Sequence, residues 1–149
     1  MMQFLKALLK ALKKSSPNKS TTSEVNNSEV VGRFTYQKGD FFKDPLKAKP
    51  KLFLPMQENG VWETSVCRVS NIQTKRMWTI GDTVRKPKVA LGVSTLDVEQ
   101  ILQAGLSAKS APETNYSEHA VILGWPEEKE KQMDFAVALA VNSKFQAHP

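Results

Sequence analysis

The sequence predicts an α+β domain with a small mixed sheet, preceded by a short amphipathic helix and a polar linker. Three observations support this class. Of the 149 residues, 40% are hydrophobic, which allows one compact core. The first half of the domain contains runs of strand length, and the second half adds two helical patterns between and after further strands.

The first fourteen residues predict a basic amphipathic helix. Apolar side chains recur at helical spacing and lysines lie opposite them. We expect this helix to contact a protein partner or an anionic membrane surface, or to pack on its own domain. The residues expected at a partner or membrane are Phe4, Leu5, Lys6, Leu8, Leu9, Lys10, Leu12 and Lys13. Residues 15–29 are rich in Ser, Thr and Asn and predict a flexible linker, so one α+β domain should occupy 30–149.

The first half of this domain predicts antiparallel strands at 30–36, 51–55 and 61–70, followed by a short helix or loop at 71–83. The Asn59-Gly60 pair is typical of a hairpin turn. Within the third strand, alternation places Trp62, Thr64, Val66 and Arg68 on one face and Glu63, Ser65, Cys67 and Val69 on the other.

The second half predicts a strand at 88–94, a helix from Thr95 to Gly105, a loop at 107–117, a strand at 119–125 and a final helix at 126–142. Apolar residues nearly surround the final helix, so we expect it to be central. A β-α-β crossover of this length would permit strands 88–94 and 119–124 to be parallel, and an antiparallel arrangement remains open.

The net charge of +6 is unevenly distributed. Residues 1–30 carry +3, residues 31–88 carry +7 and residues 89–149 carry −4. A basic front half suits an acidic partner, nucleic acid or an anionic membrane, and the alternative is that the two halves neutralise each other.

The standard motifs of cofactor and metal chemistry are missing from the sequence. One cysteine and two histidines provide no disulfide partner and no metal site, and no glycine-rich phosphate loop is present, so we expect no cofactor. Cys67 and His119 are the one possible nucleophile pair, but a mid-strand position favours a packed thiol for Cys67.

Basic residues interleave with aromatic residues in the front half of the domain, a pattern that suits single-stranded nucleic acid. The set comprises Arg33, Arg68, Arg76 and Arg85 with Phe34, Tyr36, Trp62 and Trp78. The alternative is that the tryptophans belong to the hydrophobic core.

Four segments carry a resemblance to short, uncharacterised bacterial single-domain proteins. They are Phe53–Pro55, Ser65–Arg68, Met77–Gly81 and His119–Pro126, which together resemble an S-V-x-R … W-x-x-G … H-A-x-I-x-G-W-P layout. The resemblance implies a bacterial protein and no particular activity. It draws attention to Arg68, Trp78, His119 and Trp125, and with Arg85 these give our candidate ligand-binding residues Arg68, Arg85, Trp78 and Trp125.

Two hypotheses of function follow. The first is a non-catalytic binding or accessory protein with an open basic face and a buried His119. The alternative is a small enzyme acting on a nucleotide or nucleic acid, with Arg68 and Arg85 binding phosphate and His119 transferring a proton. The enzyme hypothesis requires Arg68 and His119 to converge in one pocket. We expect a cytoplasmic protein that the helix can bring to the inner membrane surface, and the lone cysteine fits a reducing compartment.

Overall fold

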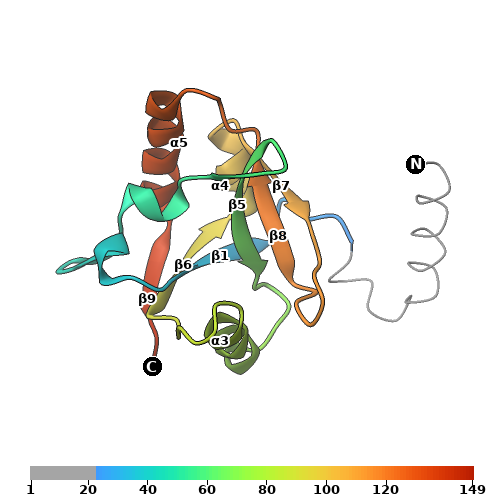
Figure 1. Ribbon diagram of the computed structural model, residues 1–149, viewed down its shortest axis with the longest axis vertical. Helices are drawn as coiled ribbons and strands as arrows, with labels where there is room; N and C mark the ends of the chain where they lie inside the picture. The colour runs from blue at the N-terminus through green and yellow to red at the C-terminus, as the bar shows by residue number, and fades with distance from the viewer. Residues whose placement is uncertain (1–22) are drawn as a thin grey trace, which may run out of the picture.

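A computed structural model of the chain describes residues 23–149, so the predicted helix at 1–14 and most of the predicted linker lie outside the described residues. A seven-stranded sheet forms the centre of the fold, with the order β7-β8-β5-β1-β6-β9 and β4 paired to β5 (Figure 1). Its strands are β1 (Val30–Thr35), β4 (Met56–Glu58), β5 (Val61–Arg68), β6 (Gly92–Asp97), β7 (Ser107–Ser110), β8 (His119–Leu123) and β9 (Lys144–Ala147). A separate hairpin joins β2 (Phe41–Lys43) and β3 (Leu46–Ala48).

In residues 23–149, the remaining elements are three α-helices and two 3₁₀ turns. They are α3 (Thr74–Thr83), α4 (Val98–Gln103), α5 (Lys129–Asn142), η2 (Lys38–Asp40) and η3 (Pro50–Phe53). Within the described residues, every helix is too short or too polar to cross a lipid bilayer. The α+β class predicted from the sequence is confirmed.

The possible parallel pairing in the second half of the chain is wrong. Every pairing in the described part of the chain is antiparallel, and β6 and β8 run in opposite directions with β1 and β5 between them. The reason is residues Ser107–Ser110, which we expected in a loop. They form β7, which runs in the same direction as β6 on the far side of the sheet. The chain then turns back from β7 into the neighbouring β8, so β8 runs opposite to β6.

The Asn59-Gly60 hairpin is confirmed. Both residues have positive φ angles, 52° and 80°, as a two-residue turn between β4 and β5 requires. The strand expected at 51–55 is wrong, because Pro50 begins the 3₁₀ turn η3 instead. A turn of this kind lets the neighbours Leu52 and Phe53 both point inward, whereas a strand would send them to opposite faces.

The helix expected from Thr95 also begins too early. Residues up to Asp97 belong to β6, where Asp97 pairs with Val30 of β1. The final helix is not central either, because Met133, Val137 and Val141 of α5 are exposed. Residues 144–147, which follow it, form the unpredicted edge strand β9.

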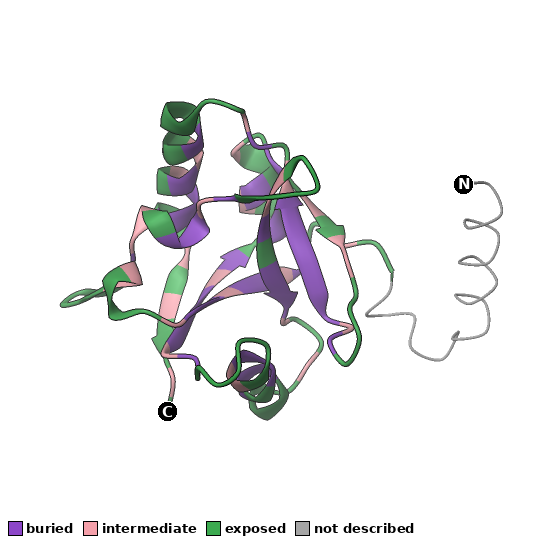
Figure 2. Ribbon diagram, viewed as in Figure 1, coloured by how far each residue is buried: buried purple, intermediate pink, exposed green. Residues whose placement is uncertain are grey.

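Hydrophobic cores lie on both faces of the sheet, as Figure 2 shows in the concentration of buried residues along its strands. On one face, Val31, Leu96 and Ile122 pack against α4, α5 and η3. On the other face, Phe34, Cys67 and Val93 pack against α3. Before β1, Val25 packs against the first core, so the last residues of the predicted linker are part of the packed structure.

Candidate functional site

The central strands β1 and β5 are joined only at one end. Their pairing comprises Val31 with Arg68 and Gly32 with Cys67, whereas β1 continues to pair with β6 as far as Thr35. Beyond Gly32 the two strands diverge, as Figure 1 shows. The divergence leaves main-chain groups of β5 without strand partners and opens a space inside the sheet.

Two side chains donate hydrogen bonds to main-chain carbonyls of β5, of which the Ser65 carbonyl faces the gap left by β1. The guanidinium of Arg33 donates from Nη1 to the Ser65 carbonyl and from Nε to the Leu52 carbonyl, both at 3.0 Å. The hydroxyl of Tyr116 donates to the Val66 carbonyl at 3.4 Å. These contacts fix the Arg33 guanidinium in the space between the strands.

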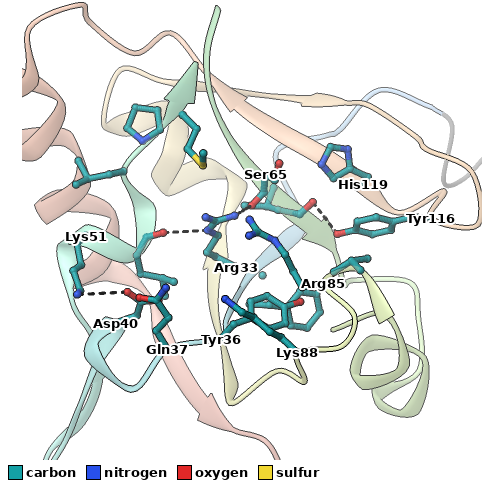
Figure 3. Close-up of a pocket in the computed structure, with 18 of the residues that line it drawn as sticks. Arg33, Tyr36, Gln37, Asp40, Lys51, Ser65, Arg85, Lys88, Tyr116 and His119 are labelled. Atoms are coloured by element: carbon teal, nitrogen blue, oxygen red, sulfur yellow. Dashed lines mark hydrogen bonds and ion pairs between the residues drawn. The ribbon is translucent and has the colours of Figure 1, made fainter. Parts of the chain in front are cut away.

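A half-open pocket of about 440 Å³ occupies this space (Figure 3). Arg33 and Arg85 lie near its middle, with Tyr116 and His119 on one side and the Asp40–Lys51 ion pair on the other. Other residues that line it include Tyr36, Gln37, Ser65, Lys88 and Glu113. Arg85 and Lys88 come from the loop after α3, and Glu113 and Tyr116 from the loop before β8.

The pocket carries an excess of positive charge. Lys51 is 3.8 Å from Asp40, but Arg33, Arg85 and Lys88 form no ion pair with any residue from 23 to 149. Burial and then the charge of Arg85 lower the pKa of Arg33, which stays cationic because a guanidinium is not deprotonated in proteins. The arrangement therefore favours an anion between the two guanidinium groups.

The tyrosines of the pocket are neutral hydrogen-bond donors. Burial raises the pKa of Tyr36 to about 12, and its hydroxyl donates to the Gly81 carbonyl at 2.6 Å. Burial likewise raises the pKa of Tyr116. The Arg85 guanidinium lies over the Tyr36 ring, 5.8 Å from its centre, and forms a cation–π contact with it.

His119 lies in the wall of the pocket and is only 7% exposed. Its Nδ1 donates to the Ala111 carbonyl at 2.7 Å, which leaves the lone pair on Nε2. In the described part of the chain, Nε2 has no hydrogen-bond partner. The ring is thus held in one tautomer with a proton acceptor available.

Of the predicted site residues, Arg85 and His119 come together in the pocket, and Arg68 does not. Cys67 pairs with His119 across β5 and β8, so the neighbouring Arg68 points to the other side of the sheet. There it donates to both carboxylate oxygens of buried Glu29, at 2.9 and 2.8 Å. The convergence of Arg68 and His119 required by the enzyme hypothesis is not observed.

The predicted tryptophans are core residues. Trp78 packs beside Phe34 and the His148 ring. Trp125 donates from Nε1 to the Ile122 carbonyl at 3.0 Å. Neither tryptophan lines the pocket, and Arg76 of the basic set is bound to Glu118 at 2.9 Å.

The Cys–His pair is not a reactive pair. Cys67 and His119 are neighbours across the sheet, but Cys67 is fully buried and burial raises its pKa to about 12. In the described part of the chain, no group of three or more Cys, His, Asp and Glu side chains is placed to hold a metal ion.

The polar and charged pocket residues that the sequence did not single out include Lys51, Glu113, Tyr116, Gln37 and Asp40. They lie in turns far apart in the sequence, and only the divergence of β1 and β5 brings them together. No family model, curated protein or solved structure matches this chain. The interpretation of the site therefore depends on its own geometry.

Proposed function

We propose that this protein binds a small phosphorylated ligand in the pocket between β1 and β5. One observation carries the proposal: the Arg33 guanidinium is held by two main-chain carbonyls and has no carboxylate partner in the described residues. A half-buried arginine without a counter-ion is costly unless an anion completes its environment.

The rest of the pocket supports this ligand class. Arg85 and Lys88 add two positive charges without ion-pair partners in residues 23–149, and an oxyanion between the two arginines would relieve their repulsion. Phosphate presents several oxygens to such donors, and guanidinium groups bind it in a bidentate way. A pocket of about 440 Å³ is within the usual size range for small molecules.

A small ligand fits the pocket better than a nucleic-acid strand. The aromatic residues predicted to stack bases include Phe34 and Trp78, and both are buried in the core. The predicted contact of residues 1–14 with a protein or membrane concerns a segment outside the described residues. In our proposal, residues 1–14 attach a non-catalytic binding protein to that protein partner or membrane.

The test is calorimetric titration of the full chain with inorganic phosphate, a nucleoside monophosphate and the matching neutral nucleoside. We expect binding of the two phosphates and none of the nucleoside. Arg85→Gln should weaken binding about tenfold or more, because a hydrogen bond to a charged group is worth about 1.5–3 kcal/mol.

Lys86→Gln is the matched control. It removes the same charge from the neighbouring exposed position, which does not line the pocket. Equal weakening by both substitutions would show a diffuse electrostatic effect and contradict the proposed site. Tight binding of the neutral nucleoside would contradict the ligand class.

His119 favours a second candidate function, the hydrolysis of a phosphate monoester in the same pocket. Its unpartnered Nε2 would take a proton from the water that attacks phosphorus and return one to the leaving alcohol oxygen. This candidate predicts release of inorganic phosphate that His119→Gln abolishes while ligand binding persists. Binding without turnover in the unmodified chain would exclude it.

A further inference from the structure

The β2–β3 hairpin stands out from the body of the domain, as Figure 1 shows at the far left. It carries two large apolar side chains that face solvent: Phe42 is 49% exposed and Leu46 is 45% exposed. Phe42 pairs with Lys47 and Leu46 pairs with Lys43, so the two apolar residues lie on opposite faces of the narrow ribbon near its tip.

The base of this hairpin is firmly attached to the domain. Phe41 stacks on Phe145 of β9 with ring centres 4.5 Å apart, and its register partner Ala48 is buried. The Lys49 amide donates to the Asp40 carbonyl at 2.8 Å and closes the base. Phe42 and Leu46 are therefore presented to solvent by an anchored element.

Lysines surround the apolar tip. Lys43, Lys47 and Lys49 have no ion-pair partner within residues 23–149, and Asp44 is the single acid between Phe41 and Lys49. The Lys49 ammonium lies 4.9 Å from the centre of the Phe42 ring. Exposed apolar side chains surrounded by lysines without ion-pair partners suit a lipid interface. The apolar side chains can contact the acyl chains, while the lysine stems cover apolar surface and their ammonium groups reach the headgroups.

We propose that the β2–β3 hairpin docks on an anionic membrane surface. Phe42 and Leu46 enter the boundary between headgroups and acyl chains, and Lys43, Lys47 and Lys49 contact lipid phosphates. The excess positive charge of the tip fits an anionic bilayer. This surface is separate from the ligand pocket, and the inference does not depend on the proposed function.

The first experiment places an environment-sensitive fluorophore on the tip through Leu46→Cys in the full chain. Cys67 is fully buried and does not compete for the label. Vesicles that contain phosphatidylglycerol should shift the emission to the blue, and vesicles of phosphatidylcholine alone should not. A label at Val141→Cys, an exposed apolar position of α5, is the control and should not respond.

The second experiment measures the partition of unlabelled protein onto the same anionic vesicles by co-sedimentation. The double change Lys47→Gln and Lys49→Gln should lower the partition coefficient about 25-fold, since each lysine near an anionic surface contributes about fivefold. The control pair Lys109→Gln and Lys144→Gln removes two exposed lysines elsewhere and should have a smaller effect.

Three outcomes would overturn the proposal. One is co-sedimentation without any response of the label at position 46, which would assign membrane binding to another part of the chain. Another is an equal response at positions 46 and 141. The third is salt-sensitive binding to single-stranded nucleic acid without binding to anionic vesicles. None of these results would bear on the Arg85 titration, so failure of this inference is distinguishable from failure of the proposed function.

Discussion

Arg33 donates a hydrogen bond to the Ser65 carbonyl across the point where β1 and β5 part. In an uninterrupted sheet, a main-chain amide would occupy this position. A side chain of β1 replaces it, so the same guanidinium completes the hydrogen bonding of β5 and supplies positive charge to the pocket. Arg85 has no such double role, because its guanidinium forms no hydrogen bond with the described residues, and only its main-chain carbonyl accepts one, from the Lys88 amide.

Replacement of Arg33 should therefore affect stability as well as binding. Arg33→Met leaves the Leu52 and Ser65 carbonyls without their donor, and we expect the free energy of unfolding to fall by about 1–3 kcal/mol. Arg85→Gln should change it by less than about 0.5 kcal/mol. Urea denaturation of both variants checks this difference, and equal loss of stability would contradict the structural role of Arg33.

The domain should lose stability in acid through two buried carboxylates. Burial alone would raise the pKa of Glu29, but hydrogen bonds from Arg68 and the Asn26 amide hold it below its ordinary value of 4.5. Burial alone would also raise the pKa of Glu118, but the hydrogen bonds from Arg76 hold this pKa below its ordinary value. A lowered folded-state pKa stabilises the fold above the ordinary value, and this stabilisation disappears as the pH falls through 4.5 and below.

The measurement is the urea midpoint of unfolding between neutral pH and pH 3. Glu118→Gln should be less stable than the unmodified chain at neutral pH, with a shallower fall in acid. Glu99→Gln, at an exposed position of α4, should keep the full pH dependence. An unchanged slope in Glu118→Gln would show that this carboxylate is not responsible.

His148 should titrate above its ordinary pKa of 6.5. Its Nε2 lies 2.9 Å from the Asp82 carboxylate, and this hydrogen bond raises the pKa, with a smaller effect of the Pro149 carbonyl. The contact therefore stabilises the fold below about pH 6.5 and is lost as the pH rises through the higher folded-state value. An NMR titration of the imidazole should show the raised pKa, and Asp82→Asn should lower it towards 6.5.

Gly81 should not tolerate alanine although it lies in the helix α3. A Cβ at this position would be 2.7 Å from Cε1 of Phe34 and 3.2 Å from the Ala90 Cβ. Overpacking of this kind costs about 1–3 kcal/mol and outweighs the gain of about 1 kcal/mol in helix propensity. Lys75→Ala, at an exposed position of the same helix, should be nearly neutral in thermal denaturation. A more stable Gly81→Ala variant would show that Phe34 can move aside.

Much of the fold was predictable because local patterns agreed with tertiary packing. The alternating pattern of Val61–Arg68 and the apolar run of His119–Leu123 each form a strand of the sheet, β5 and β8. The pattern failed where a tertiary contact decided the structure. Leu96 has the spacing of the helix that follows, but its pairing with Val31 keeps it in β6. The strand β9 forms through pairing with β6, where Phe145 lies opposite Ser94, and through the stacking of Phe145 on Phe41, which lies 104 positions earlier in the sequence.

The candidate site was predictable only in part. Arg85 was singled out as a cation near aromatic residues, and His119 as one of two histidines. What the sequence does not reveal is which arginine has a carboxylate partner. Arg68 and Arg33 both belong to central strands. Glu29 forms an ion pair with Arg68, whereas, within the described residues, the Arg33 guanidinium bonds only to main-chain carbonyls and can still bind an anion.

Cys67 lies where β1 and β5 are still joined, fully buried and with its pKa raised to about 12. At neutral pH, the thiol therefore stays protonated and is not converted to the thiolate that oxidants and alkylating reagents attack. The Cys67 thiol of the folded domain should therefore react with neither oxidised glutathione nor an alkylating reagent. A single buried cysteine of this kind is unreactive, so its presence does not distinguish a reducing compartment from an oxidising one.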